Sequence, residues 1–158
     1  MIKPCFYKIG RAGVTNIPKC GSQTLESISE GCFDDVSLVD HQVAFLRDPI
    51  DRLKSLYSFI NEYVGLIVPY KIHCWQCFVE WVLETDNDHA KPQSEFLYGT
   101  EDYYLLDDMD DVLNQLVGLT PIQKHKTSLI APYNDYKLAE IKSKYAKDFE
   151  LMERLNGS

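Results

Sequence analysis

A short segment near the N-terminus combines the residue types that proteins use to bind phosphate groups. It is Pro18-Lys19-Cys20-Gly21-Ser22-Gln23-Thr24, and it joins an extended segment, Gly13–Ile17, to a helix predicted over Gln23–Glu30. The N–H groups at a helix N-terminus attract anions, and a glycine lets the backbone approach a ligand closely. Lys19 adds a positive charge, and two hydroxyl side chains add donors. The segment therefore predicts a phosphate-binding loop.

The order of the residues in this loop distinguishes it from the loop of nucleotide kinases. That loop follows the pattern G-x-x-x-x-G-K-[ST], with lysine directly after the last glycine. Here Lys19 precedes Gly21 by two positions, and the upstream glycine is missing from the required position. We interpret the segment as a phosphate loop of another kind. The alternative is an ordinary strand-to-helix turn with a solvated lysine.

A second basic site follows the next predicted strand, Val43–Leu46. The tripeptide Arg47-Asp48-Pro49 comes directly after it, and here the aspartate suits a helix N-cap and the proline the first helical position. Ligands of parallel α/β sheets lie at the carboxyl ends of the strands, so Arg47 is expected at the same edge as Lys19. An arginine fork can donate two hydrogen bonds to one phosphate.

The helix predicted over Pro49–Val64 adds further polar residues to this second site. Ser55 lies nearly two turns into the helix, and Arg52 lies one turn before Ser55. The alternative is that Arg47 and Arg52 pair with the neighbouring aspartates on a solvated surface. An arginine that directly follows a buried strand is less often of that kind.

Hydrophobic spacing predicts the remaining elements. Extended segments are expected at Cys5–Ile9, Val36–Val39 and Tyr103–Leu106, and helices at Trp75–Glu84, Asp108–Val117 and Lys137–Leu155. Strands that alternate with helices imply an α/β fold with a small, mainly parallel sheet flanked by helices. The chain has 158 residues, 45% of them hydrophobic, which suits a single domain over residues 1–158.

Composition and charge narrow the expected partners and location. The net charge is −8, which argues against nucleic-acid binding, since that requires a basic face. No stretch approaches the ~20 apolar residues of a membrane span. The start of the chain does not have the pattern of a signal peptide, so a cytoplasmic location with reduced cysteines is expected.

Two local patterns resemble metal sites, and we interpret both as structural. Cys74 and Cys77 lack a second ligand pair for zinc, so they are expected as core cysteines near the helix Trp75–Glu84. A thioredoxin-like role is disfavoured because the motif does not follow a suitable strand. The acidic run Asp107–Asp111 lacks the glycine and glutamate of a calcium loop, and a charged helix N-terminus explains it.

Taken together, the two basic sites resemble those of one enzyme family. Ile17–Leu25 resembles the 5′-phosphosulfate loop of sulfotransferases, and Phe45–Tyr57 resembles their 3′-phosphate element. The likeness is to the carbohydrate sulfotransferases and their microbial relatives. Phe78–Val82, followed by His89 and Pro92-Gln93, is similar to a middle segment of that family, and Tyr145–Leu151 is similar to its C-terminal helix.

This resemblance implies a P-loop-NTPase-like three-layer sandwich that uses 3′-phosphoadenosine 5′-phosphosulfate (PAPS) as donor, releases 3′-phosphoadenosine 5′-phosphate (PAP) and needs no metal. Lys19 would stabilise charge on the leaving phosphate, and Arg47 and Ser55 would hold the 3′-phosphate. The rest of the loop would surround the 5′-phosphate: Cys20, Gly21, Ser22, Gln23 and Thr24. The acceptor would be a hydroxyl on a carbohydrate or small metabolite.

The sequence departs from the family pattern in the loop and after it. Cys20 replaces a commoner threonine-like residue, and Gln23 replaces a commoner serine or threonine. Only Gln23–Leu46 separates the two motifs, where relatives have a longer stretch that often carries the catalytic base. An acceptor pocket that is reduced or differently built is therefore expected. The alternative function is a nucleotide-binding module with the same fold and little or no catalysis.

The general base is expected among the histidines and acidic residues near the two motifs. His89 lies in a polar loop beside Pro92-Gln93 and could line the pocket. His41 is the other histidine candidate, but it lies six residues before Arg47, or ~20 Å along a strand. That is the wrong end of the sheet unless the segment folds back. The remaining candidates are acidic: Glu30, Asp34 and Asp35. The alternative is that the protein has no general base.

Overall fold

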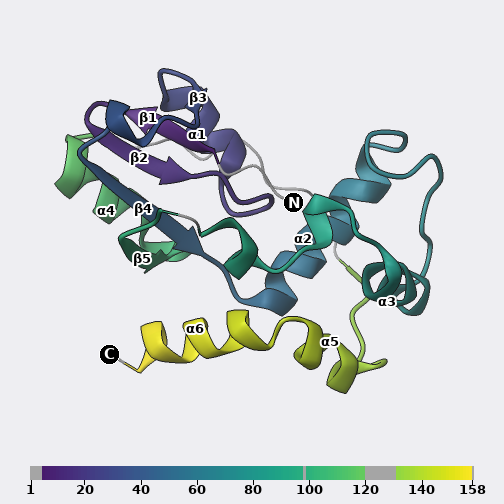
Figure 1. The fold of residues 1–158 in the computed structure, drawn as a ribbon. Helices are drawn as coiled ribbons and strands as arrows, with labels where there is room; N and C mark the ends of the chain where they lie inside the picture. The colour runs from purple at the N-terminus through teal and green to yellow at the C-terminus, as the bar shows by residue number, and fades with distance from the viewer. Residues whose placement is uncertain (1–4, 98, 120–130, 158) are drawn as a thin grey trace.

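The computed structural model describes residues 5–97, 99–119 and 131–157, apart from the side chains of Ser22 and Gln23. A five-stranded sheet forms one part of the molecule, and helices pack against it and extend beyond it (Figure 1). The strands are β1 (Phe6–Ile9), β2 (Ala12–Thr15), β3 (Cys32–Phe33), β4 (His41–Leu46) and β5 (Asp102–Leu105). Their order across the sheet is β3-β1-β2-β4-β5.

The sheet is mixed, so the prediction of a mainly parallel sheet is wrong. The pairs β2–β4 and β4–β5 are parallel, whereas β1 pairs antiparallel with both β2 and β3. The physical reason is the short connection between the first two strands. Gly10 and Arg11 alone join β1 to β2, with Gly10 at φ 60°, and a connection of this length permits only an antiparallel hairpin.

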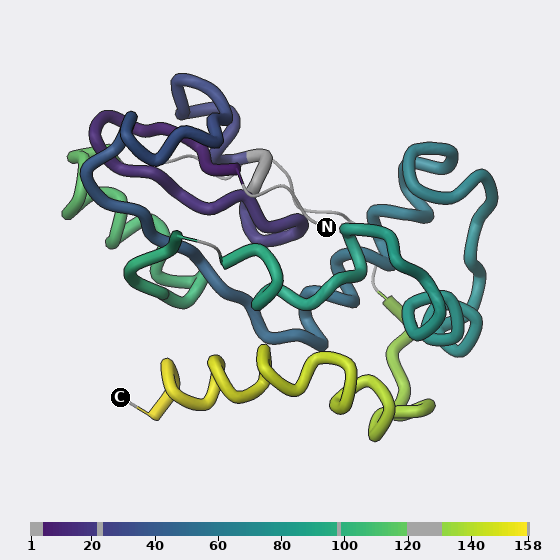
Figure 2. The backbone as a smooth tube through the Cα atoms, in the orientation of Figure 1, coloured from purple at the N-terminus to yellow at the C-terminus, as the bar shows by residue number. Residues whose placement is uncertain are grey.

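Six α-helices accompany the sheet in the described part of the chain. They are α1 (Ser22–Ile28), α2 (Pro49–Glu62), α3 (Trp75–Glu84), α4 (Met109–Val117), α5 (Leu138–Lys144) and α6 (Ala146–Asn156). Helix α2 begins as predicted, because Asp48 accepts the N–H groups of Ile50 and Asp51 and Pro49 is the first helical residue. The chain then passes through α3 and returns to the sheet at β5 (Figure 2).

The interior strand β4 shows how helices cover both faces of the sheet. Val43 and Phe45 pack with residues of α1 and α4, and Ala44 and Leu46 pack with Met152 of α6. This alternation follows from the two-residue period of a strand. A further core joins α2, α3 and α5 beside the sheet, and it includes the rings of Trp75, Phe78 and Tyr57.

Two predicted elements differ from the structure. Val36–Val39 was expected as extended, but Val36–Leu38 is a 3₁₀ helix whose start is capped by the carboxylate of Asp35. The helix predicted over Lys137–Leu155 is divided at Tyr145, between α5 and α6. Tyr145 is buried and its hydroxyl donates to the carbonyl of Ala90, so a long-range contact fixes the position of the break.

The expectation of reduced core cysteines is wrong for Cys74 and Cys77. They form a disulfide, and Cys77 is exposed. Cys74 is the N-cap of α3, and the first helical turn brings the Cα atoms of the pair to 5.4 Å, within the usual range for a disulfide. Cys5, Cys20 and Cys32 are free thiols, as expected.

Among the described residues, none of the helices combines the length and the apolar character that crossing a membrane requires. The same residues contain no group of three or more histidine, cysteine or acidic side chains placed to hold a metal ion.

Candidate functional site

The two basic segments meet at one edge of the sheet. Strands β2 and β4 are parallel neighbours, with Val14 opposite Val43, so the segments that follow them lie side by side. The guanidinium of Arg47 donates from Nη1 to the carbonyl of Lys19 at 3.3 Å. The structure therefore brings together the two cations that the sequence placed at this edge.

Lys19 is held in an unusual conformation. Its φ is 64°, in the left-handed region that costs a non-glycine residue roughly 1 kcal/mol or more and that is concentrated at functional sites. The Nζ atom lies 4.3 Å from the ring centroid of Phe59 on α2. Burial, with the nearby charge of Arg47 as the next cause, lowers the pKa of Lys19 to about 8.

Neither cation has a carboxylate at ion-pair distance within the part of the chain that the structure describes. Burial of the Lys19 ammonium is the main cause of its lowered pKa, and repulsion by the nearby charge of Arg47 adds to it. A bound anion would offset this cost by pairing with both of them. The arrangement is chemically suited to a phosphate or sulfate group.

His89 lies beside the same aromatic ring as Lys19. The imidazole of His89 and the ring of Phe59 are stacked with nearly parallel planes, at 12°, and their centroids lie 6.3 Å apart. Burial first, then the charges of Arg52 and Lys19, lowers the pKa of His89 below its ordinary value of 6.5. The histidine is therefore neutral at pH 7, as a general base must be.

Asn87 defines which nitrogen of His89 can accept a proton. The Oδ1 atom of Asn87 accepts the backbone N–H of His89 at 2.9 Å and lies 3.2 Å from its Nδ1. Because that oxygen is an acceptor, Nδ1 must carry the proton. The lone pair is then on Nε2, which is the nitrogen available as a base.

Arg52 is a buried structural residue that does not line the site around Lys19 and Arg47. Its side chain is only 2% exposed, and its guanidinium donates to three backbone carbonyls: Pro18 at 2.9 Å, Lys91 at 2.6 Å and His89 at 3.4 Å. It thereby fixes the start of the loop and the turn around His89 onto α2. The alternative of a solvated surface arginine is wrong for Arg52, and sequence reasoning missed its role.

Gln93 and Asp148 together hold the backbone of Arg47 in place through hydrogen bonds. The amide of Gln93 accepts from the backbone N–H of Arg47 at 2.9 Å and donates to its carbonyl at 2.7 Å. The buried carboxylate of Asp148, on α6, accepts the N–H groups of Gln93 and Ser94. Both residues lie in segments that carried the resemblance, and their contact joins those segments in space.

Two side chains of the predicted phosphate loop, those of Cys20 and Thr24, are buried. The Cys20 thiol is buried and donates to Oε1 of Gln93 at 3.1 Å, and burial raises its pKa to about 11. The Thr24 side chain is also buried. Neither of these two side chains is therefore exposed toward a ligand, and the backbone N–H of Cys20 donates to the carbonyl of Ile17 at 3.1 Å. The side chains of Ser22 and Gln23 lie outside the described part.

Gly21 has a packing role besides the one expected from the loop. Its φ is 80°, and a Cβ atom at this position would lie 2.6 Å from the terminal methyl of Met109 and 3.1 Å from Leu106. The absence of a side chain lets α4 approach the loop. The sequence indicated a glycine that lets a ligand approach, and the structure adds this close approach of another helix.

Ser55 lies on the face of α2 that is turned toward the loop. It stands at i+3 from Arg52 and at i−4 from Phe59, and these spacings place the three residues along one side of a helix. Arg52 contacts the carbonyl of Pro18, and Phe59 contacts the ammonium of Lys19. Ser55 is half-buried between them.

His41 does not belong to this site. It is the first residue of β4, whereas Arg47 follows the last one, and the six-residue strand separates them by roughly 20 Å. The ring of His41 lies 2.9 Å from a carboxylate oxygen of Glu101 and 2.9 Å from one of Asp102. A cavity of about 530 Å³ adjoins it, lined also by Val36. The segment does not fold back, so the structure does not bring His41 together with Lys19 and Arg47.

No protein-family model, curated protein or solved structure matches this chain.

Proposed function

We propose that this protein is a sulfotransferase that moves the sulfuryl group of PAPS to a hydroxyl acceptor, on a carbohydrate or small metabolite. The observation that carries the proposal is the meeting of Lys19 and Arg47 at the ends of adjacent parallel strands, with the Arg47 guanidinium against the Lys19 carbonyl at 3.3 Å. The resemblance of the two segments to sulfotransferases is the reason for proposing PAPS as the nucleotide. Lys19 would pair with its 5′-phosphosulfate, and Arg47 would pair with its 3′-phosphate.

In the proposed reaction, the acceptor oxygen forms a bond to sulfur while the bond from sulfur to the bridging oxygen of the phosphosulfate breaks. Nε2 of His89 takes the proton of the acceptor hydroxyl. Lys19 stabilises the charge that develops on the leaving phosphate, and Arg47 and Ser55 hold the 3′-phosphate. Catalysis rests on positioning and charge stabilisation, which such a group transfer requires most.

The proposed fold assignment is a P-loop-NTPase-like sandwich with two added strands, the antiparallel strand β1 and the short edge strand β3. Its support is the strand–loop–helix unit of β2, the loop and α1, followed by the parallel strands β4 and β5. Helices on both faces of β4 agree with this architecture.

The experiment is a calorimetric titration with PAP of the wild type, Arg47→Ala and a matched control, Arg154→Ala. Arg154 is an exposed arginine on α6 that pairs with Glu150, so its loss should leave binding unchanged. We expect micromolar binding by the wild type and the control, and at least tenfold weaker binding by Arg47→Ala. Absence of binding by the wild type would refute the proposal.

A nucleotide-binding module without efficient catalysis is the second candidate. It is favoured by the burial of Cys20 and Thr24, which reduces the number of loop side chains that could contact the phosphosulfate. Turnover separates the two functions. A binding module would bind PAP but transfer no sulfuryl group from PAPS to any hydroxyl acceptor.

A further inference from the structure

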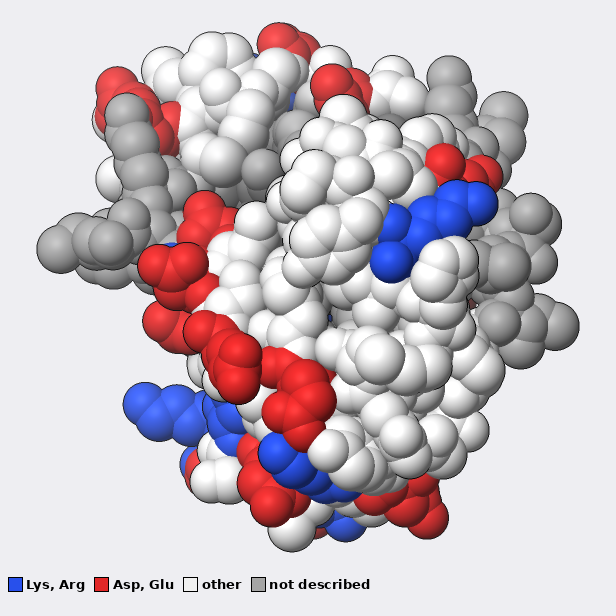
Figure 3. Space-filling model, turned by 90° about the vertical axis from the view of Figure 1, so that its right-hand side faces the viewer, with Lys and Arg blue, Asp and Glu red and all other residues white. Residues whose placement is uncertain are grey.

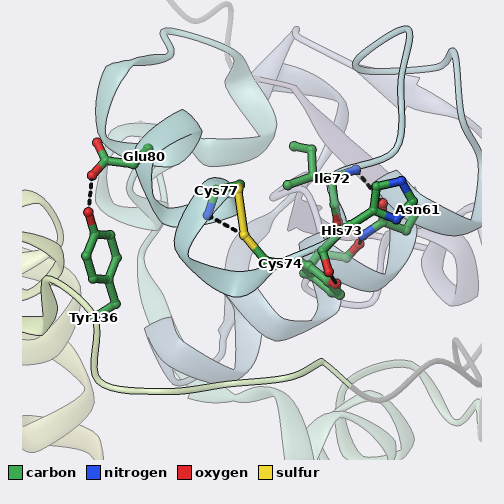
Figure 4. The surroundings of a disulfide bond; sticks show 8 residues. Asn61, Ile72, His73, Cys74, Cys77, Glu80 and Tyr136 are labelled. Atoms are coloured by element: carbon green, nitrogen blue, oxygen red, sulfur yellow. Dashed lines mark hydrogen bonds between the residues drawn. A yellow bond between two sulfur atoms is a disulfide. The ribbon is translucent and has the colours of Figure 1, made fainter.

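A two-cysteine motif, Cys74-Trp75-Gln76-Cys77, begins helix α3, far along the chain from the loop and strand ends described above. The disulfide joins the N-cap residue to the third residue of the helix (Figure 4). Cysteines in this spacing at a helix start exchange with other thiols readily, because the helix stabilises a thiolate there. The proposed function gives this pair no role.

The two sulfur atoms differ in accessibility and in environment. Cys77 is exposed, whereas Cys74 is half-buried. The Sγ atom of Cys74 accepts the backbone N–H of Cys77 at 3.1 Å. As the N-cap of a ten-residue helix, Cys74 also lies at the positive end of the helix dipole. Cys77 is thus the sulfur that a thiol can reach, and Cys74 is the better leaving group.

The segment before Cys74 is fixed on α2. The side chain of Asn61 accepts the N–H of Ile72 at 2.7 Å and donates to its carbonyl at 2.9 Å. The hydroxyl of Tyr57 donates to the carbonyl of His73 at 3.2 Å. Figure 4 shows Asn61 beside Ile72 and His73, directly before the disulfide. The N-cap sulfur is therefore held in place while Cys77 faces outward.

The charges around the disulfide do not oppose an incoming thiolate. The first turn of α3 contains no acidic residue. Glu80, one turn beyond Cys77, is paired with Lys137 at 2.7 Å and accepts a hydrogen bond from Tyr136. The side of the molecule where α3 lies shows an area of uncharged side chains with both acidic and basic residues around it (Figure 3).

We propose that Cys74 and Cys77 form a redox-active pair that exchanges with dithiols through attack at Cys77. A thiolate of the dithiol forms a bond to Sγ of Cys77, and the bond between the two protein sulfurs breaks, leaving Cys74 as a thiolate. The second thiolate of the dithiol then attacks the sulfur bound to Cys77, which releases Cys77 as a thiolate. The dithiol is oxidised to a disulfide, and the protein disulfide is reduced to two thiols after uptake of two protons.

The test equilibrates the whole folded protein with reduced and oxidised glutathione over a range of ratios, followed by acid quenching, alkylation and peptide mass mapping. We expect the peptide with Cys74 and Cys77 to switch between no label and two labels without unfolding. A peptide that stays reduced at every ratio, or a disulfide that is reduced only in urea, would overturn the proposal.

The direction of attack is tested with Cys74→Ser and Cys77→Ser, each treated with oxidised glutathione. We expect the glutathione adduct on Cys77 of the first variant to form about tenfold faster than that on Cys74 of the second, because Cys77 is exposed whereas Cys74 is half-buried and access limits the rate. Cys32 is the internal control, since it is exposed but its pKa is raised to about 12 by burial and by Cys5. Equal adduct rates at Cys77 and Cys32 would contradict the assignment, and the wild-type titration decides the proposal if a variant does not fold.

Discussion

Lys19 is the residue on which the proposed anion site depends most. Its ammonium is partly buried beside Arg47, and its pKa is lowered to about 8. We expect Lys19→Met to weaken PAP binding by about 10- to 100-fold, the usual effect of one charge-assisted hydrogen bond. The measurement is calorimetric titration at pH 7, with Lys147→Met as a control because Lys147 is exposed on α6. Unchanged affinity of Lys19→Met would exclude its contact with the nucleotide.

The lowered pKa of Lys19 also predicts that the stability of the folded protein depends on pH. The pKa of Lys19 is lower in the folded protein, about 8, than its ordinary value of 10.5, so the folded state binds fewer protons between these values. Stability therefore rises with pH across that window, and below about pH 8 the buried charge destabilises the protein. We expect ligand-free Lys19→Met to be more stable than the wild type at pH 7, and this difference to shrink from pH 8 to 10. Urea unfolding at several pH values measures it, and a constant difference would contradict the prediction.

The lowered pKa of His89 gives a prediction that can be tested without an acceptor substrate. Burial and the charges of Arg52 and Lys19 lower its pKa, so the folded state binds fewer protons than the unfolded state near pH 6.5. Stability should consequently fall as the pH drops below 6.5. NMR titration should give a midpoint below 6.5, and addition of PAP should raise it because the phosphates offset the charge of Lys19. His89→Asn identifies the signal, and a midpoint above 6.5 in the free protein would contradict this account.

At the scale of elements, Arg52 joins α2 to the loop and to the turn around His89. Its replacement by leucine would leave three carbonyls without a donor, those of Pro18, Lys91 and His89. We expect Arg52→Leu to lower the free energy of unfolding by about 3 kcal/mol, roughly 1 kcal/mol for each lost hydrogen bond. Arg154→Leu, which removes an exposed pair, should cost less than about 0.5 kcal/mol. Urea unfolding measures both, and equal losses would contradict the role of Arg52.

Helix α6 supports Arg47 through two successive contacts. Asp148 accepts two backbone N–H groups at Gln93 and Ser94, and Gln93 in turn holds the backbone of Arg47. Asp148→Asn replaces one acceptor oxygen by a donor NH₂ group, so one buried N–H loses its partner. We expect a loss of about 2 kcal/mol in stability and weaker PAP binding. The control Asp110→Asn, in the exposed first turn of α4, should leave PAP binding unchanged and lower stability by less than about 1 kcal/mol.

At the scale of the whole molecule, the C-terminal helix completes both the core and the site. Tyr145, Asp148 and Met152 are all buried, and they contact the turn at Ala90, the segment at Gln93 and the face of β4. A chain that ends at Lys144 should therefore lose the single cooperative unfolding transition of the whole protein. Circular dichroism during heating measures this, and a truncated chain with an unchanged transition would contradict it.

The sequence alone determined the features that depend on neighbouring residues. The bounds of α3 and the start of α2 follow from hydrophobic spacing and from Asp48-Pro49, which act within one or two turns. The meeting of Lys19 with Arg47 was also predictable, because parallel neighbouring strands bring the segments after them to one edge. The sequence also disfavoured His41 as the general base. His41 begins the strand that ends directly before Arg47, so it lies at the opposite end of that strand.

Only the tertiary structure decided the features that depend on distant partners. The guanidinium of Arg52 finds backbone carbonyls rather than carboxylates, and Asp148 finds the N–H groups of Gln93, 55 residues away. The break at Tyr145 and the antiparallel placement of β3 beside β1 likewise rest on long-range contacts. Hydrogen-bond partners of this kind are selected when the core packs, because a buried polar group must be satisfied by whichever segment the fold brings beside it.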